Sequence, residues 1–289
     1  MRTATESLPA TTAMGAVHLT VADLGRSLAY YDEAVGLALL ERAGGRAWLG
    51  AGQTELLGLV EEPGARHAAR YTGLYHFALR VPERADLARW LAHAARDRVS
   101  LLGMSDHFVS EALYLTDPDG HGIEIYRDRP RELWEGLVTS RMTTDPLDVA
   151  GLMSELDDPA TAPSEGLPAG TDMGHVHLQV ADVADAIAFY RDLLGFDLVA
   201  ELVGTAAFFG AGGYHHHVGA NIWHSRGASP PPEGTAALRY ATIVLPDAPE
   251  RDRVASRIAD AGQEPERRPE GVLVRDPSGI ALLLAAAAG

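Results

Sequence analysis

Two stretches of the chain, MGAVHLTVAD at residues 14–23 and MGHVHLQVAD at residues 173–182, are nearly identical. Self-similarity at a fixed offset indicates duplication of a structural unit, so the chain contains two copies of one unit. The offset is 159 residues (173 − 14), and it also relates Tyr31 to Tyr190, Gly36 to Gly195, Asp117-Pro118 to Asp276-Pro277 and Gly120 to Gly279.

Each copy divides again into two similar modules. Residues 17–21 alternate as a β-strand does, and Asp23 and Gly36 are suited to begin and end the helix expected at 24–35. Three strands follow, and the same order then restarts. The predicted later elements are strands at 37–40, 47–50, 55–60 and 75–81, a helix at 84–96, and strands at 99–102, 111–116 and 122–126.

This pattern predicts an α+β protein with four βαβββ modules paired into two tandem half-barrel domains. Modules one and two are expected to form a first domain at 14–130, and modules three and four a second domain at 173–289. The linker at 131–172 contains loop-forming sequences, Asp157-Asp158-Pro159 among them, and a short helix is expected at 147–156.

Composition excludes several classes of function. The 289 residues carry a formal net charge of −16, which disfavours nucleic acid and anionic membranes as partners. The absence of cysteine excludes disulfides, thiolate metal sites and a thiol nucleophile. No apolar run is long enough for a membrane span, and the N-terminal stretch is not a signal peptide, so the cytoplasm is the expected location.

Three residues emerge when the modules are compared. His18 and His76 lie in the first strands of modules one and two, and Glu124 lies in the last strand of module two. Taken alone, each of the three is more readily explained as an ordinary core or surface residue than as a metal ligand. Pairing two modules as a half-barrel, however, would bring them together as a two-histidine, one-carboxylate metal site with open positions. The second copy has His177, Tyr240 and Leu283 at these places, so no metal is expected there.

On these residues the chain resembles the vicinal-oxygen-chelate superfamily, which includes glyoxalases, bleomycin-resistance proteins and extradiol dioxygenases. The nearest resemblance is to two-domain catechol 2,3-dioxygenases of aromatic catabolism. The matching signature is His107, Leu113-Tyr114, Asp117-Pro118-Asp119-Gly120 and Glu124.

The resemblance implies Fe(II), or alternatively Mn(II), at His18, His76 and Glu124, with a small aromatic diol and O2 as substrates. His107 and Tyr114 would be the catalytic residues, His107 bonding a substrate oxygen and Tyr114 assisting deprotonation. The exposed strand edges of such modules favour a homodimer.

Some alternatives stay open. A glyoxalase-type lyase or isomerase would need a fourth ligand near residues 57–59, where there is no carboxylate, and an aromatic-antibiotic binding protein would need no metal. The acid–base histidine that many extradiol enzymes carry is missing from module one, and His67 is the nearest candidate. His215, His216 and His217 are expected to pack within the second domain rather than bind metal.

Overall fold

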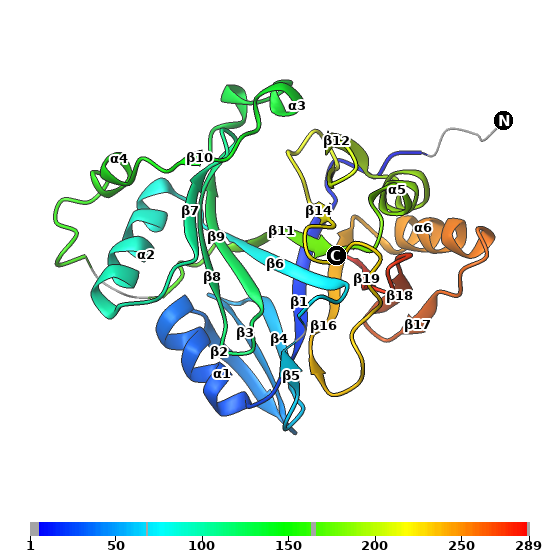
Figure 1. Ribbon diagram of the computed structural model, residues 1–289, viewed down its shortest axis with the longest axis horizontal. Helices are drawn as coiled ribbons and strands as arrows, with labels where there is room; N and C mark the ends of the chain where they lie inside the picture. The colour runs from blue at the N-terminus through cyan, green and yellow to red at the C-terminus, as the bar shows by residue number, and fades with distance from the viewer. Residues whose placement is uncertain (1–5, 68, 163–165, 288–289) are drawn as a thin grey trace.

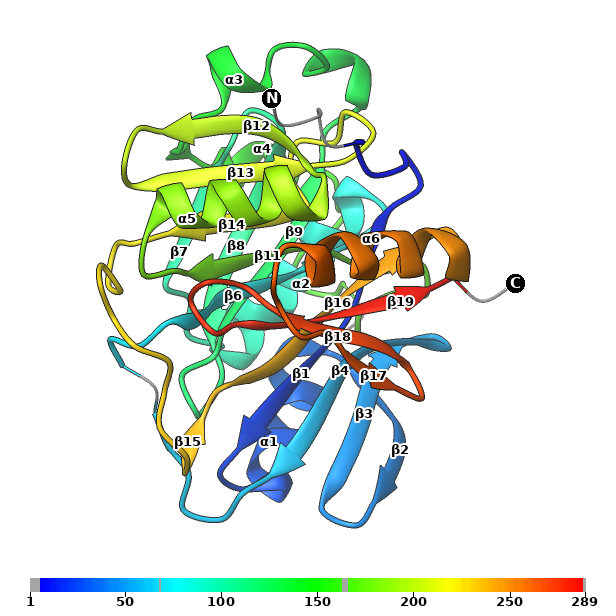
Figure 2. The same cartoon turned by 90° about the vertical axis from the view of Figure 1, so that its right-hand side faces the viewer.

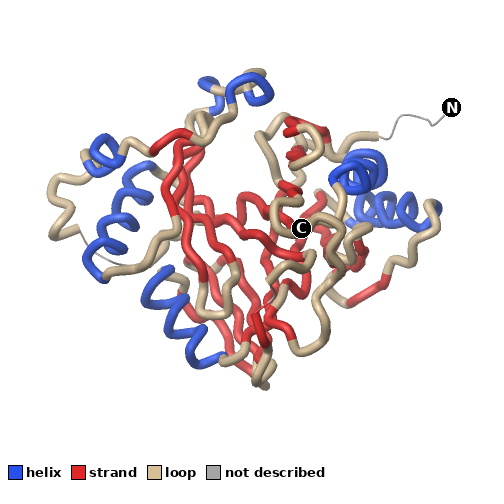
Figure 3. Tube along the Cα trace, in the orientation of Figure 1, coloured by secondary structure: helices blue, strands red, loops and turns tan. Residues whose placement is uncertain are grey.

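The computed structural model describes residues 6–67, 69–162 and 166–287. Residues 163–165 of the predicted linker and 288–289 at the end of the predicted second domain lie outside this part. Strands form the centre of the molecule and helices lie on the outside (Figure 3). The α+β architecture of two half-barrel sheets agrees with the prediction.

The sheet that matters for the site has nine strands. It contains β7 (Gly103–Asp106), β8 (Ser110–Thr116), β9 (Gly122–Asp128) and β6 (Gly73–Arg80) from module two, and β11 (Asp172–Gln179), β14 (Val218–Asn221), β13 (Ala206–Gly210) and β12 (Asp197–Leu202) from module three. The linker strand β10 (Asp145–Pro146) lies beside β7 at one edge, and the order runs from β10 through β6 and β11 to β12.

The other sheet joins the first and last modules. Its order is β17 (Glu266–Arg268), β18 (Gly271–Arg275), β19 (Ala281–Ala286), β16 (Leu238–Leu245), β1 (Ala13–Val21), β4 (Thr54–Glu61), β3 (Arg46–Ala51) and β2 (Ala38–Ala43). A separate two-stranded sheet of β5 (Arg66–His67) and β15 (Thr235–Ala236) joins the loop between modules one and two to the loop between modules three and four.

The predicted pairing of modules was therefore wrong. Module two pairs with module three through β6 and β11, and module four pairs with module one through β16 and β1. Each of the two large sheets combines strands of both sequence repeats, so the described residues of 14–130 do not form a metal-bearing sheet of their own. The repeat pattern reveals which strands are equivalent, but equivalent first strands can pair within or across repeats equally well.

The helices cover the outer faces of the sheets (Figure 2). Those of the modules are α1 (Leu24–Tyr30) with the π-helical turn η1 (Tyr31–Val35), α2 (Arg84–Asp97), α5 (Val183–Ile187) with η3 (Ala188–Leu194), and α6 (Ala248–Asp260). The linker has η2 (Arg131–Leu133), α3 (Val138–Arg141) and α4 (Val149–Met153).

Local chemistry explains where the first helix begins and ends. The Asp23 side chain accepts a hydrogen bond from the Arg26 backbone N–H, and Gly36 ends the helix in the left-handed conformation at φ 88°. The expected strand at 99–102 is not formed. Val99 instead donates its backbone N–H to Ala94 at the end of α2, and the strand begins at Gly103.

The Asp-Pro-Asp-Gly turn fixes the helix of module one against module two. Asp117 accepts backbone hydrogen bonds from Asp119 and His121 through one oxygen, and Tyr31 donates its hydroxyl to the other at 2.9 Å. Tyr190 donates to Asp276 in the same way in the second repeat. The helix–turn contact thus stays within a repeat although the sheets cross between repeats.

Helices in the described ranges are all too short or too polar to cross a lipid bilayer.

Candidate metal centre

A row of four paired residues crosses the nine-stranded sheet. Tyr114 on β8 pairs with Glu124 on β9, Glu124 with Ala78 on β6, and Ala78 with His175 on β11. Paired residues project from the same face of a sheet, so Tyr114, Glu124 and His175 share one face. The small side chain of Ala78 leaves space between the carboxylate and His175.

A second row lies beside the first. His76 is two residues before Ala78 on β6 and therefore projects from the same face. It pairs directly with His177 on β11, and their ring centroids are 5.1 Å apart. Two strand registers thus bring three histidines and one glutamate together.

Three of these side chains could hold a metal ion. The ligand atoms of His76, Glu124 and His175 all lie within 4.8 Å of one another, and all three residues are buried. Glu124 Oε2 is 3.0 Å from His76 Nε2 and 3.2 Å from His175 Nε2. Two imidazoles and one carboxylate with open positions suit non-haem Fe(II).

The protonation and hydrogen bonding of these three side chains fit a metal site. His76 Nε2 is buried and has no hydrogen-bond partner within the described residues, although it faces Glu124. Burial disfavours the Glu124 carboxylate, but its attraction to the nearby His175 and His76 imidazoles outweighs burial and holds its pKa well below the usual value. Burial lowers the pKa of His175, which keeps the imidazole neutral, as a metal ligand must be.

His18, predicted as a ligand, lies elsewhere. It is on β1 in the eight-stranded sheet, where its ring stacks on Tyr240 at 4.3 Å and its Nε2 is 3.5 Å from Glu55. The comparison of repeats had matched His18 with His177, and both do occupy equivalent registers. The histidine that joins His76 and Glu124 is instead His175, two residues before His177. The counterpart of His175 in the first repeat is Ala16.

The signal that identifies His175 was present in the sequence. It lies in the second repeat's HVH, where the first repeat has AVH. The eight-stranded sheet has Ala16, Tyr240 and Leu283 where the nine-stranded sheet has His175, His76 and Glu124. The second repeat was expected to hold no metal of its own, and it supplies one of the three candidate ligands.

His107 and Tyr114 lie together beside the three candidate ligands. Tyr114 Oη is 2.6 Å from His107 Nε2, and His107 Nδ1 is 2.7 Å from the Thr143 carbonyl oxygen. Because that carbonyl can only accept, Nδ1 carries the proton and Tyr114 donates to Nε2. Burial, followed by the charge of Glu124, raises the pKa of Tyr114 well above its usual value, so its hydroxyl keeps its proton.

Two further histidines reach this region. His177 and His216 are buried, and burial lowers the pKa of each well below the usual value, so both are neutral. His216 Nδ1 is 2.9 Å from His215 Nδ1, and His215 Nε2 is 2.7 Å from Asp128 Oδ1. Residues 215–217 were expected to pack and hydrogen-bond in the second domain rather than bind metal, and they lie outside the candidate ligand group. They precede β14 in a loop rather than a strand, His215 bonds to Asp128 of the first repeat, and His216 lines the cavity.

These groups line a cavity of about 1050 Å³. The sheet curls so that β7–β9 and β12–β14 stand on opposite sides of it, with α3 above the opening (Figure 1). The linker closes that side, since Met142, Thr143 and Thr144 line the cavity and Thr139 Oγ1 donates to the Val199 carbonyl on β12. His67 also lines it, with Nδ1 2.9 Å from the Asp119 carbonyl oxygen.

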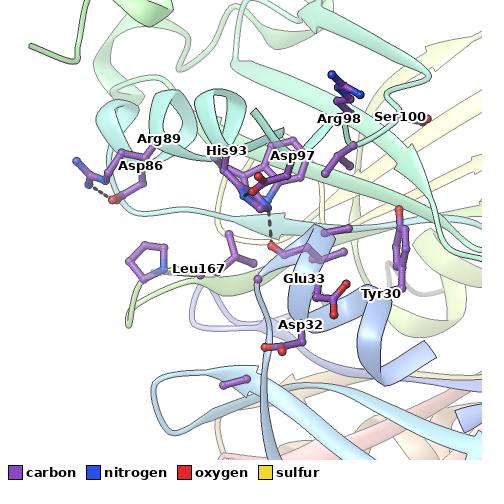
Figure 4. Close-up of a pocket in the computed structure, with 18 of the residues that line it drawn as sticks. Tyr30, Asp32, Glu33, Asp86, Arg89, His93, Asp97, Arg98, Ser100 and Leu167 are labelled. Carbon is purple, nitrogen blue, oxygen red and sulfur yellow. Dashed lines mark hydrogen bonds and ion pairs between the residues drawn. The ribbon is translucent and has the colours of Figure 1, made fainter. Parts of the chain in front are cut away.

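A larger cavity of about 1430 Å³ lies between η1 and α2 (Figure 4). Four of its charged or titratable side chains form two pairs, Asp86 with Arg89 and His93 with Asp97 at 2.7 Å. None of the three candidate metal ligands is there. The larger volume therefore does not identify the functional site. The cavity of about 1050 Å³ that contains His76, Glu124 and His175, here called the histidine–glutamate cavity, is the better candidate.

The chain belongs to the glyoxalase/bleomycin resistance protein/dioxygenase superfamily, whose model matches residues 13–125 and 172–284. A catechol-2,3-dioxygenase of Bacillus subtilis (strain 168) is 44% identical over 274 residues, covering 92% of this chain and 94% of that protein.

Solved structures share the fold. A putative dioxygenase from Bacillus subtilis superposes with a TM-score of 0.68 at 14% identity, covering 98% of this chain and 86% of the other. Glyoxalase I from Zea mays superposes with a TM-score of 0.59 at 18% identity, covering 96% and 92%.

Proposed function

We propose that the protein is an extradiol dioxygenase that opens the ring of a catechol with O2. The observation that carries the proposal is the buried His76–Glu124–His175 group facing a cavity that also contains His107 and Tyr114. The 44% identical catechol-2,3-dioxygenase supports the same reaction class. The reaction is balanced because both oxygen atoms of O2 enter a single open-chain product. That product forms when the ring C–C bond next to the two hydroxyl-bearing carbons breaks.

His76, Glu124 and His175 would hold Fe(II), with Mn(II) as the alternative. A metal bound there would supply adjacent open positions where the diol and O2 meet. The protein's own groups do the remainder. Neutral His177 and His216 line the same cavity and can accept hydrogen bonds from diol hydroxyls, and the Tyr114 hydroxyl can donate one to a diol oxygen.

His107 and Tyr114 form a hydrogen-bonded pair beside the three candidate ligands, with Tyr114 as the donor. The Thr143 carbonyl fixes the His107 tautomer, and that tautomer lets Nε2 accept from Tyr114. When a substrate oxygen arrives, the Tyr114 hydroxyl can turn from His107 to it and stabilise developing negative charge.

The site favours ring cleavage over glyoxalase chemistry. Among the described residues lining the cavity, Glu124 is the single carboxylate. Glu55, close to the expected position of a fourth ligand, lies beside His18 in the other sheet. Three protein ligands leave more open positions than four, as reaction of a bound diol with O2 requires.

The direct test loads the protein anaerobically with Fe(II) and then adds catechol and air. Extradiol cleavage gives a yellow semialdehyde with one O2 consumed per catechol. Parallel loading with Mn(II) identifies the active metal. If catechol, methylcatechols and dihydroxybiphenyl all gave neither colour nor O2 uptake with either metal, the proposal would fail.

A further inference from the structure

The rim of the histidine–glutamate cavity is unusually apolar. Leu102 is 72% exposed, Leu202 is 54% exposed and Trp223 is 46% exposed, and all three line the cavity. Leu102 precedes β7 and Leu202 ends β12, so the two come from opposite edges of the curled sheet (Figure 1). Exposed apolar side chains gathered around a cavity mark a binding surface more often than scattered ones do.

The rim is continuous with the metal ligands. His76 contacts His177 at 5.1 Å between ring centroids, and His177 contacts Trp223 at 5.3 Å. Tyr75 packs edge-on against both His177 and Trp223. One aromatic wall thus runs from the reacting region to the rim, with no charged side chain in it.

The cavity is also larger than the diol ring needs. Pockets of roughly 300–1,000 Å³ take drug-sized ligands, so a cavity of about 1050 Å³ leaves most of its space unfilled by a single ring. The chain carries 40 Asp and Glu residues, yet within the described lining Glu124 is the single acid and Arg70 the single Arg or Lys. This lining matches an uncharged apolar group.

From these observations we infer that the substrate is a catechol carrying an extended apolar substituent, which lies along the Tyr75–Trp223 wall and against Leu102 and Leu202. This inference rests on the proposed function, because it places the diol at His76, Glu124 and His175. It adds the class of substituent that the cavity selects.

The test measures kcat/KM for catechol and for 3- and 4-alkylcatechols from methyl to hexyl, with the Fe(II)-loaded full chain. Burial of each methylene should raise kcat/KM about two- to fourfold until the rim is passed. Leu102→Ser and Leu202→Ser should flatten this dependence, seen as a lower ratio of hexylcatechol to catechol. Leu39→Ser is the matched control, since Leu39 is similarly exposed on β2 outside this cavity.

Anaerobic binding gives a readout that does not need turnover. Without O2, 4-hexylcatechol should change the tryptophan fluorescence of the Fe(II)-loaded wild type and bind more tightly than catechol. The preference should fall in Trp223→Ser.

Three results would overturn the inference. One is catechol cleavage with no gain in either alkyl series, which would leave the proposed function standing. Another is preference for 3-(3,4-dihydroxyphenyl)propionate over 4-butylcatechol, which would indicate that Arg70 binds a carboxylate group on the substrate. The third is a dimer that dissociates in Leu202→Ser while the dependence of kcat/KM on alkyl length stays unchanged. That result would indicate that the apolar rim is an interface with a second copy of the protein. Absence of cleavage with every catechol would instead refute the proposed function.

Discussion

His175 Nε2 lies 3.2 Å from Glu124 Oε2, although the two residues come from different sequence repeats. The pairing of β6 with β11 creates this contact, and β9 on the other side of β6 supplies the carboxylate. The two equivalent histidines of the repeats, His18 and His177, are by contrast in different sheets.

His175→Ala should therefore abolish metal binding, whereas His18→Ala should retain it. Loss of one of the three candidate ligands removes a donor atom from the metal, and we expect affinity to fall by roughly 100-fold or more, at least as much as loss of a supporting contact. Metal content after anaerobic loading and desalting measures the difference. Equal metal content in the two variants would refute the ligand assignment.

Tyr114→Phe should lower kcat while leaving metal content unchanged. The variant keeps the ring but removes the hydroxyl that donates to His107 at 2.6 Å. Proton-transfer and charge-stabilising groups contribute typically about 10²–10⁴-fold, and we expect a loss in this range. Stopped-flow cleavage of catechol after a matched check of iron content gives the measurement. Wild-type turnover in Tyr114→Phe would remove this residue from the chemistry.

His216→Ala and His67→Ala should separate the two candidates for the acid–base histidine. His216 is buried near His175, with ring centroids 4.2 Å apart, whereas His67 is exposed and bonded to the Asp119 carbonyl. We expect His216→Ala to lose about 10²-fold or more in kcat and His67→Ala to lose little. The reverse order would return the role to His67.

His217 should make the metal-free protein sensitive to acid. Burial lowers its pKa from 6.5 to about 3. Below pH 6.5 the His217 imidazole therefore binds a proton in the unfolded chain but stays neutral in the folded protein until the pH approaches 3. Its contribution to stability is complete above pH 6.5 and is lost as the pH falls towards 3. At pH 5 the loss is about 2 kcal/mol.

His217→Gln should remove this part of the pH dependence, because Gln keeps an acceptor for the Ala211 backbone N–H. Urea unfolding at pH 7.5 and pH 5 measures it, with exposed His224→Gln as the control. An identical stability change between the two pH values in wild type and His217→Gln would contradict the assignment.

Gly174→Ala should impair both folding and metal binding. An added Cβ would lie 1.7 Å from the Tyr126 hydroxyl, and Gly174 directly precedes the ligand His175. We expect a loss of about 1–3 kcal/mol in unfolding free energy, as overpacking usually causes. Gly15→Ala is the matched control, since Gly15 is the repeat equivalent with its nearest contact at 3.0 Å and has no ligand beside it. A larger effect at Gly15 would count against this view.

The sequence predicted the modules well because hydrophobic alternation and the capping residues act locally. The helix at 24–35, the Asp-Pro-Asp-Gly turn and the strands bearing His76 and Glu124 all lie close to where they were expected. Pairing of β6 with β11 rather than with β1 depends on long-range packing, which residue spacing does not encode. The choice of partner strand moves the candidate ligand from β1 to β11, and on β11 the histidine beside Glu124 is His175 rather than His177, the equivalent of His18.

The position of the linker, α3 and η2 could not be predicted for a similar reason. Met142 to Thr144 meet the cavity only because the linker crosses from β9 to the β12 side of the sheet. No periodicity marks such a crossing. The strand expected for His215 and His216 is a loop, which no local pattern in the sequence indicated.

The crossed pairing of repeats makes the protein resemble a dimer joined into one chain. Severing the chain between the repeats would leave each fragment with one half of each sheet, and neither fragment would own a complete metal site. The two fragments should be inactive alone and regain ring cleavage only by complementation. The eight-stranded sheet has Ala16, Tyr240 and Leu283 where the nine-stranded sheet has His175, His76 and Glu124, so the described residues of this dimer-like chain hold a candidate ligand group in one of the two large sheets.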